Sequence, residues 1–463
     1  MNENQNGVIR DARQLGVPKM LLLGLQHMFA MFGATVLVPI LVQGYGLPLN
    51  IQTTLFFAGI GTLFFHLCTK LKVPAFLGSS FAYLGGFQAV ALLDSGSYAA
   101  MAPGEKLQYA CGGIVVAGLL YVVLAAVIKA VGVHKVMRFL PPVVTGPIII
   151  LIGLNLAPTA VNNAKSCWWL ALLSIAVIVA ANIWGKGMIK IIPILLGVVI
   201  PYIVAVAANL MGATAVDAAG QAVPLMSFAS VNEAALLGFQ PFITDFGGSI
   251  AKFDLTSILV MAPIAIAAMM EHIGDMSAIS ATVGASFMED PGLHRTLIGD
   301  GIATSLAGLF GGPANTTYGE NTGVLVLSRV HDPKVVRLAA VYAVILSFSP
   351  KFAALVNSIP TAIIGGVSFI LYGMISAIGV RNVVENRVDF TNSRNLIIAA
   401  VILVCGLGFT GGITFSVGGA HVTLTSLAIA AIAGIALNAI LPGKDYVFGS
   451  DVTEGRSGDF GRY

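Results

Sequence analysis

The sequence has few charged residues for its length. Of its 463 residues only 10% are Asp, Glu, Lys or Arg, whereas a soluble globular domain carries about 25%. These 24 basic and 21 acidic residues cannot cover the surface of a water-soluble protein of this size. Together with a hydrophobic content of 57% and a net charge of only +3, the shortage excludes a cytosolic enzyme, a disordered chain and a nucleic-acid-binding protein.

Cysteines are also few, and the motifs of several enzyme classes are missing. The four cysteines form no C-x-x-C pair, so we expect small buried apolar residues. There is no G-x-x-x-x-G-K-[ST] nucleotide loop, no H-E-x-x-H zinc motif and no nucleophile with an evident base. We therefore expect no enzymatic activity, no cofactor and no metal, and any uphill transport must use an ion gradient.

What the sequence has in abundance is long apolar runs. About twenty consecutive apolar residues form a helix long enough to cross the hydrocarbon core of a bilayer. The first run is longer than the apolar part of a secretory signal. We predict fourteen spans, at 20–43, 50–69, 74–94, 109–131, 139–158, 167–185, 190–211, 256–280, 296–310, 314–328, 335–356, 360–379, 395–410 and 419–441.

The basic residues give these spans an orientation. Lys and Arg accumulate in the cytoplasmic loops of membrane proteins. If the N-terminus is cytoplasmic, only four of the 24 Lys and Arg residues fall outside, namely Lys106, Lys165, Lys252 and Lys351. We therefore predict an all-α, multi-pass protein of the cell membrane, with cytoplasmic tails at 1–19 and 442–463.

The longest hydrophilic connection, 212–255, divides the chain into two halves of seven spans. Because seven is odd, the second half enters the membrane in the opposite orientation. This is the layout of secondary transporters that are built from inverted repeats.

Two predicted spans have the composition of poor helices. The third contains PAFLGSSFAYLGG at 74–86, and the tenth contains GGPANTTYGENTG at 311–323. Gly and Pro interrupt helices, and Ser, Thr and Asn compete for backbone hydrogen bonds. The two segments occupy matching positions in the halves, and such paired interruptions indicate a transporter's binding site. The alternative is a pair of ordinary Gly-rich packing faces.

Four acidic residues lie within predicted spans, where a charged side chain is costly. They are Glu271, Asp275, Asp300 and Glu320. No Lys or Arg lies near mid-depth to pair with them, and burial without a cation favours a protonated carboxyl group. The four are therefore candidate proton carriers. Asp300 has the alternative of an interfacial residue or helix cap. His27, in the first span, is either a proton-coupling or a packing residue.

Four segments closely resemble the nucleobase–ascorbate transporter family and, within it, the bacterial uracil permeases. They are QHMFAMFGATVLVP at 26–39, LGSSFAY at 77–83, EHIGD at 271–275 and NTTYGEN at 315–321. The family signature [QEP]-N-x-G-x-x-x-x-T-[RKG] is met from Glu320 to Arg329, with Ser328 in place of the usual Thr.

The resemblance implies a fold of fourteen segments in two inverted repeats, with short β-strands interrupting segments 3 and 10. It also implies a division into two domains and a homodimer. The core domain would comprise 20–131 and 256–356, and the gate domain 132–211 and 357–441, with 212–255 as the extracellular connection.

The resemblance further implies uptake of uracil together with a proton. Substrate contacts would come from Glu271, Glu320 and Phe81 and from the backbone at Gly319 and near Phe81, at Ala82. Tyr318 is a candidate second aromatic face. Proton coupling would involve Glu320, Asp275 and His27. The supporting residues would be Asn321, Ser80 and Thr317.

Two positions give opposite indications about the substrate. Uracil permeases of the family can carry His where Asp275 stands, and xanthine and urate carriers often carry Asp there. Glu320 is the uracil-type residue, because those purine carriers usually have Gln. A proton- or sodium-coupled xanthine or urate permease is therefore the alternative. An anion exchanger of the same architecture is disfavoured by Glu271 and Glu320, which would repel its substrate.

Overall fold

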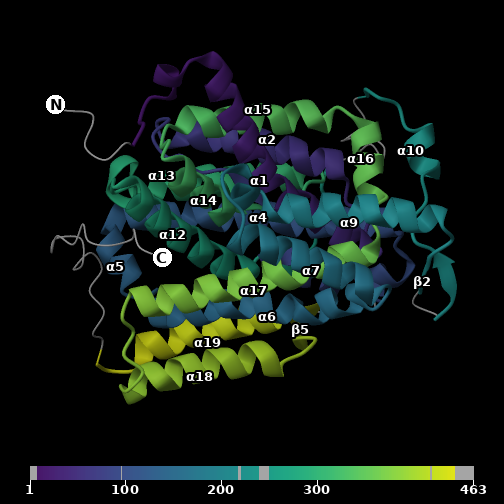
Figure 1. Ribbon diagram of the computed structural model, residues 1–463. Helices are drawn as coiled ribbons and strands as arrows, with labels where there is room; N and C mark the ends of the chain where they lie inside the picture. Colours follow the sequence, from purple (N-terminus) through teal and green to yellow (C-terminus); the bar gives the residue numbers. More distant parts are fainter. Residues whose placement is uncertain (1–7, 95, 217–219, 239–249, 418–419, 444–463) are drawn as a thin grey trace.

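The computed structural model describes residues 8–94, 96–216, 220–238, 250–417 and 420–443. Apolar helices dominate it (Figure 1). The longer helices are α1 (Val17–Gly44), α2 (Ile51–Cys68), α3 (Leu84–Ala91), α4 (Pro103–Val131), α6 (Pro142–Ala164), α7 (Trp168–Ile183), α9 (Pro193–Leu210), α11 (Leu255–Met261), α12 (Ile264–Val283), α13 (Leu293–Leu309), α14 (Gly319–Ser328), α15 (Pro333–Ser347), α16 (Pro350–Asn357), α17 (Thr361–Glu385), α18 (Ser393–Gly408) and α19 (Ser426–Ile440).

The shorter elements join these helices. The short helices are η1 (Ala12–Leu15), η2 (Phe81–Tyr83), η3 (Gly96–Ala100), α5 (Val133–Met137), α8 (Met188–Ile191), α10 (Ala229–Glu233) and η4 (Met288–Gly292). The strands are β1 (Leu77–Ser79), β2 (Thr214–Val216), β3 (Ala222–Pro224), β4 (Asn315–Thr317), β5 (Ile413–Val417) and β6 (Ala420–Leu424).

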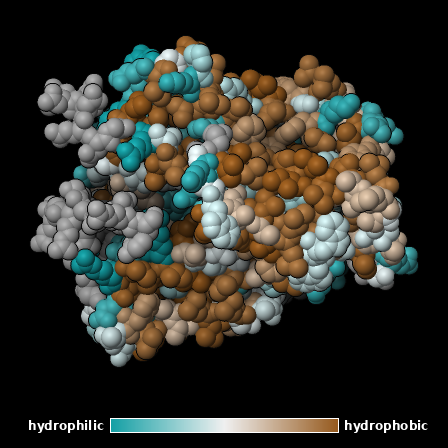
Figure 2. Space-filling view, viewed as in Figure 1, coloured by the Kyte–Doolittle hydropathy of each residue, from teal (hydrophilic) through white to brown (hydrophobic). Residues whose placement is uncertain are grey.

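Within the described ranges, seven helical segments are long and apolar enough to cross a membrane, one of them formed by α11 and α12 together (Leu255–Val283). An eighth crossing results if α15 and α16, which meet at 90°, count as one span. The other predicted spans coincide with shorter helices, so the number of crossings stays a prediction. Figure 2 shows apolar residues over most of this face of the molecule, with hydrophilic groups gathered toward its two ends. Such a surface suits contact with lipid.

Two predicted spans differ from the helices that the structure contains. The predicted span 419–441 is wrong at its start, because residues 420–424 form β6, which pairs with β5, and α19 begins only at Ser426. The predicted span 335–356 is not one straight helix. Pro350 begins α16, and the hydroxyl group of Ser349 accepts a hydrogen bond from the Phe352 N–H at the new helix start (3.3 Å).

Glycines allow helices from the two halves of the chain to pack closely. A Cβ atom on Gly118 of α4 would lie 2.4 Å from the Gly301 carbonyl oxygen of α13, and one on Gly301 would lie 2.5 Å from the Gly118 carbonyl oxygen. A Cβ atom on Gly153 of α6 would lie 2.1 Å from the Tyr372 carbonyl oxygen of α17. Small residues permit this approach of two backbones, and α6 and α17 run side by side in Figure 1.

The interrupted segments meet as two short strands among the helices. β1 and β4 pair antiparallel, with Leu77 opposite Thr317, Gly78 opposite Thr316 and Ser79 opposite Asn315. All six residues are buried. The predicted strands in segments 3 and 10 are therefore present. β1 runs into η2 and α3, and β4 runs into α14. The paired strands β1 and β4, called the strand crossing below, therefore direct two helix starts toward one region.

Candidate functional site

The site is assembled around the starts of η2 and α14 and one face of α12. Tyr318 is the N-cap of α14, and Gly319 and Glu320 form its first turn. An acidic side chain is favoured there by the helix dipole. Glu271 and Asp275 are four residues apart on α12, so they share one face of that helix. The structure thus brings together three of the predicted site acids.

The three acids differ from their surroundings in exposure. Glu271, Asp275 and Glu320 are half-buried, whereas Asn321 and the neighbouring strands are fully buried. They are close enough to interact electrostatically. Glu271 Oε2 is buried and has no hydrogen-bond partner among the described residues. An unsatisfied acceptor of this kind is costly unless a ligand or water donates to it.

Asp275 is held by strand β4. The hydroxyl group of Thr317 donates a hydrogen bond of 2.7 Å to Asp275 Oδ2. Thr317 itself is buried at the end of β4, immediately before the α14 start. The position of the α12 carboxyl group is therefore tied to the strand crossing.

His27 of α1 is in contact with Asn321 of α14. Asn321 Nδ2 donates to the His27 carbonyl oxygen (3.0 Å) and lies 3.2 Å from His27 Nδ1. Both residues are fully buried. Among the described residues His27 forms no ion pair with Asp275, and its part in proton coupling stays a prediction. The contact instead joins α1 to the first turn of α14.

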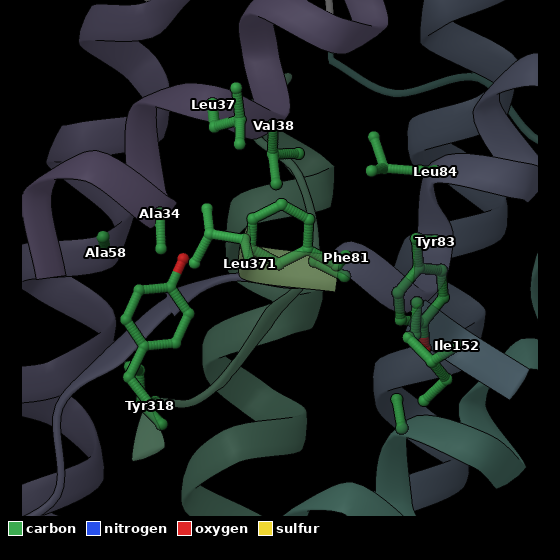
Figure 3. Packing of buried hydrophobic residues seen from close by; sticks show 14 of the residues in the cluster. Ala34, Leu37, Val38, Ala58, Phe81, Tyr83, Leu84, Ile152, Tyr318 and Leu371 are labelled. Carbon is green, nitrogen blue, oxygen red and sulfur yellow. The ribbon is translucent and has the colours of Figure 1, made fainter. Parts of the chain in front are cut away.

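The aromatic residues of the crossing have separate environments. Tyr318 donates a hydrogen bond to the Ser79 carbonyl oxygen (2.9 Å), and Figure 3 shows its hydroxyl group directed toward α1. Figure 3 also shows Phe81 near Val38 and Leu371, and its ring lies 6.0 Å from the Tyr372 ring of α17. Tyr318 is therefore engaged in packing, whereas Phe81 faces the helix that flanks the site.

The remaining predicted residues line the same crossing. Ser80 continues β1, and its N–H donates to the Ala314 carbonyl oxygen (2.8 Å). Its buried hydroxyl group has no partner among the described residues. Ala82 lies in η2 and is buried. Gly319 has room beside it, because a Cβ atom there would lie 3.9 Å from Asp275 Oδ1 and 3.9 Å from Ile378 Cδ1 of α17.

One buried pair beside the site was not predicted. His272 Nδ1 lies 2.9 Å from Asp300 Oδ2, and His272 Nε2 lies 3.0 Å from the Thr296 hydroxyl oxygen. All three side chains are fully buried. Asp300 lies well inside α13 and is fully buried, so of the two alternatives for this residue the interfacial or capping one is wrong. The sequence signal for this burial was the position of Asp300 between Gly299 and Gly301. These two glycines allow α2 and α4 to approach α13 closely.

Comparison with known proteins places the chain among permeases. The model described as the permease family matches residues 18–415. A protein named uracil permease from Bacillus caldolyticus is 41% identical over 431 residues, which cover 91% of this chain and 92% of the relative. The uracil permease of Bacillus subtilis (strain 168) is 40% identical over 431 residues, covering 90% and 91%. A putative pyrimidine permease of Escherichia coli (strain K12) is 36% identical over 444 residues, covering 95% and 93%.

Solved structures of membrane transporters share the fold. The transmembrane domain of the cyanobacterial bicarbonate transporter BicA aligns with a TM-score of 0.63 at 14% identity, over 93% of this chain and 100% of that chain. The murine anion transporter Slc26a9 in its inward-facing state aligns with a TM-score of 0.61 at 10% identity, over 95% and 72%. At these identities the likeness concerns architecture alone.

Proposed function

Because this chain belongs to the permease family, and is thus a transporter rather than an enzyme, we propose that it carries uracil into the cell together with a proton. The names of the relatives at 36–41% identity support uracil or a related pyrimidine as the substrate. The observation that carries the proposal is the group of half-buried acids with an unsatisfied acceptor, Glu271 Oε2, at the strand crossing.

Uracil has the hydrogen-bonding groups that this region lacks. It is planar and neutral, with two N–H donors and two C=O acceptors. Glu271 accepts from a ring N–H, and a protonated Glu320 or the backbone N–H of Gly319 donates to a carbonyl. Phe81 lies against the ring face, and backbone at Ala82 borders it. Analogues that lack these groups leave buried polar atoms unpaired, which provides selectivity.

Proton coupling follows from the same acids. Three carboxyl groups that interact without a nearby Lys or Arg do not all ionise together, so one proton is shared among them. Glu320 holds the proton that strengthens substrate binding, and Asp275 exchanges it with solvent. Protonation and substrate binding then favour each other reciprocally. His27 contributes by holding Asn321, with Ser80 and Thr317 as further supports of the crossing.

We also propose fourteen crossings arranged as two inverted repeats. The contacts between helices support this, since most have a counterpart seven predicted spans away. The pair α2–α15 corresponds to α4–α13, α1–α15 to α4–α11, and α7–α9 to α18–α19. The pair α6–α18 corresponds to α7–α17, and α1–α9 to α12–α19. A repeated unit related by a two-fold axis predicts this correspondence.

The strand crossing supports the same symmetry at the level of single atoms. The Leu77 N–H at the start of β1 donates to the Thr62 hydroxyl group of α2 (2.9 Å), and the Asn315 N–H at the start of β4 donates to the Thr304 hydroxyl group of α13 (3.1 Å). Each hydroxyl group also donates to the carbonyl oxygen of the same strand residue. The antiparallel pairing of β1 and β4 fits units of opposite orientation.

The division into a core and a gate domain belongs to this proposal. The core comprises 20–131 and 256–356 and carries the acids, and the gate comprises 132–211 and 357–441. The core and the gate approach each other at two glycines. A Cβ atom added to Gly274 of the core would lie 3.8 Å from Ile149 of the gate, and one added to Gly319 would lie 3.9 Å from Ile378. Movement of the core along this apolar border would expose the site to each side in turn.

The charged side chains at the two ends of the helices support the proposed orientation, with both termini cytoplasmic. Lys252 and Glu105 form an ion pair of 2.7 Å on the outer side, while Arg295, Lys72 and Lys334 gather at the opposite helix ends. The homodimer stays a proposal that rests on the family resemblance.

Uptake into proteoliposomes tests the function. We expect an inward proton gradient to drive accumulation of radiolabelled uracil, and excess 5-fluorouracil, but not xanthine or urate, to block it. A sodium gradient at constant pH should have no effect. Uptake of xanthine instead of uracil would contradict the substrate assignment and favour the purine alternative, to which Asp275 points. Exchange of bicarbonate or chloride would instead favour an anion exchanger with the same architecture.

The hydrogen bond from Thr317 to Asp275 predicts a graded effect. Thr317→Val keeps the side-chain shape but removes the donor, so Asp275 loses a partner worth about 1.5–3 kcal/mol. We expect proton-driven uracil uptake at low substrate concentration to fall about tenfold or more. Thr317→Ser, which retains the hydroxyl group, should keep most of the activity. Equal activities for the two variants would show that this bond is unimportant for transport.

A further inference from the structure

A cavity of about 190 Å³ lies at one end of the helix bundle. It is lined by Cys68, Lys129, His294, Arg295 and Ile298. These residues belong to the last turn of α2, the last turn of α4 and the beginning of α13, and α13 packs against both of the other helices. In the proposed orientation this end is cytoplasmic.

The walls of the cavity are positively charged. Arg295 is half-buried, and its Nη1 donates to the Cys68 carbonyl oxygen (3.3 Å), which holds the guanidinium group at the α2 terminus. Lys129 and Lys70 are exposed, and together with Arg295 they interact electrostatically with His294. Among the residues that the structure describes, no acidic side chain forms an ion pair with Lys129 or Arg295, whereas Asp290 interacts electrostatically with Lys70.

One neighbouring acid already has a basic partner. Asp290, in the turn before α13, forms an ion pair with Lys72. The pairing leaves an excess of positive charge at the cavity. A positive-inside charge bias alone requires basic residues somewhere on this side, but it does not require them to surround a hollow between three helices.

The α2 end that lines the cavity carries exposed apolar side chains, which we call its apolar rim. Leu67 and Leu71 lie on either side of the lining residue Cys68 in the sequence and are 67% and 47% exposed. Side chains of this kind at a helix end face the acyl region of a bilayer. A ligand that fits therefore combines an anionic group with hydrocarbon chains.

We propose that this cavity binds the phosphate headgroup of an anionic phospholipid, with Arg295 and Lys129 as its main contacts. Basic pockets between transmembrane helices on the cytoplasmic side are suited to such headgroups. A free phosphate ion shares the charge but not the affinity for the apolar rim, so the rim favours the lipid. Because α13 also carries Asp300 and packs on both helices, the bound lipid would hold the three helix ends together.

Thermal unfolding of the purified full-length protein tests the proposal. We expect phosphatidylglycerol added to detergent micelles to raise the unfolding temperature more than an equal amount of phosphatidylcholine. Each cation contributes roughly 1 kcal/mol near a charged headgroup, equivalent to about fivefold in affinity. Half-saturation should therefore require about fivefold more phosphatidylglycerol for Lys129→Gln, and about 25-fold more for Lys129→Gln with Arg295→Gln.

Lys19→Gln is the matched control, since Lys19 is an exposed cation near the same end of the molecule, at the start of α1. It should respond to phosphatidylglycerol like the wild type. Arg295→Lys keeps the positive charge but removes the guanidinium group that contacts the α2 terminus. It therefore distinguishes weaker headgroup binding from damage to the α2 terminus. Equal stabilisation by the two lipids, an undiminished effect in the double variant, or equal stabilisation by inorganic phosphate would each overturn the proposal. Uracil uptake is measured separately, so failure here leaves the transport proposal unaffected.

Discussion

Replacing Glu320 by Gln is expected to abolish the accumulation of uracil against its gradient. Gln has nearly the same shape as a protonated Glu and retains a donor for the substrate carbonyl, but it cannot release a proton. Binding would then no longer depend on pH, and transport in one direction would lose its driving force. We expect at least a tenfold loss of proton-driven uptake, with exchange of external for internal uracil retained.

The measurement is uptake into proteoliposomes at several external pH values, alongside uracil counterflow in the absence of a gradient. Glu289→Gln is the control, because Glu289 is an exposed acid in the turn before α13 and does not belong to the group of half-buried site acids. A Glu320→Gln protein that still accumulates uracil with the wild-type pH dependence would remove Glu320 from the coupling mechanism. Loss of counterflow as well would assign Glu320 to binding alone.

Much of this architecture can be predicted from composition. The shortage of charge and the long apolar runs predict membrane helices, and the paired Gly, Pro, Ser and Thr runs at 74–86 and 311–323 predict the interruptions that became β1 and β4. Pro350 inside a predicted span was an available signal for the bend between α15 and α16. The β-branched residues Val422 and Thr423, which follow a Gly-Gly pair in the sequence, were a signal for strand β6.

The pairings between distant side chains could not be predicted in this way. Asn321 and His27 are separated by 294 residues and meet because α1 packs against α14. The residue types show that each polar group requires a partner when buried, but not which one. The His272–Asp300 pair was not predicted for the same reason. The sequence shows that Asp300 lies within an apolar run, but its partner depends on how α12 and α13 are placed.

Gly78→Ala is expected to eliminate uracil transport while leaving the helices folded. A Cβ atom at this position would lie 2.2 Å from Cζ of the Tyr318 ring and 2.7 Å from its hydroxyl oxygen. The ring must therefore move, which breaks its 2.9 Å hydrogen bond to the Ser79 carbonyl oxygen. Overpacking in a buried position typically costs about 1–3 kcal/mol.

The displacement reaches the site because Tyr318 is the N-cap of α14 and Glu320 lies two residues later. A shift of the ring between the two strands changes where both Gly319 and Glu320 stand relative to Glu271 on α12. Uracil uptake and binding of labelled uracil to the purified protein should both fall at least tenfold.

Gly85→Ala is the control within the same segment, because a Cβ atom there meets nothing within 4 Å. If the steric conflict with the Tyr318 ring causes the loss of uracil binding, adding Tyr318→Leu to Gly78→Ala should recover part of that binding. Uptake by Gly78→Ala equal to that of Gly85→Ala would mean that the strand crossing tolerates displacement and does not position the acids.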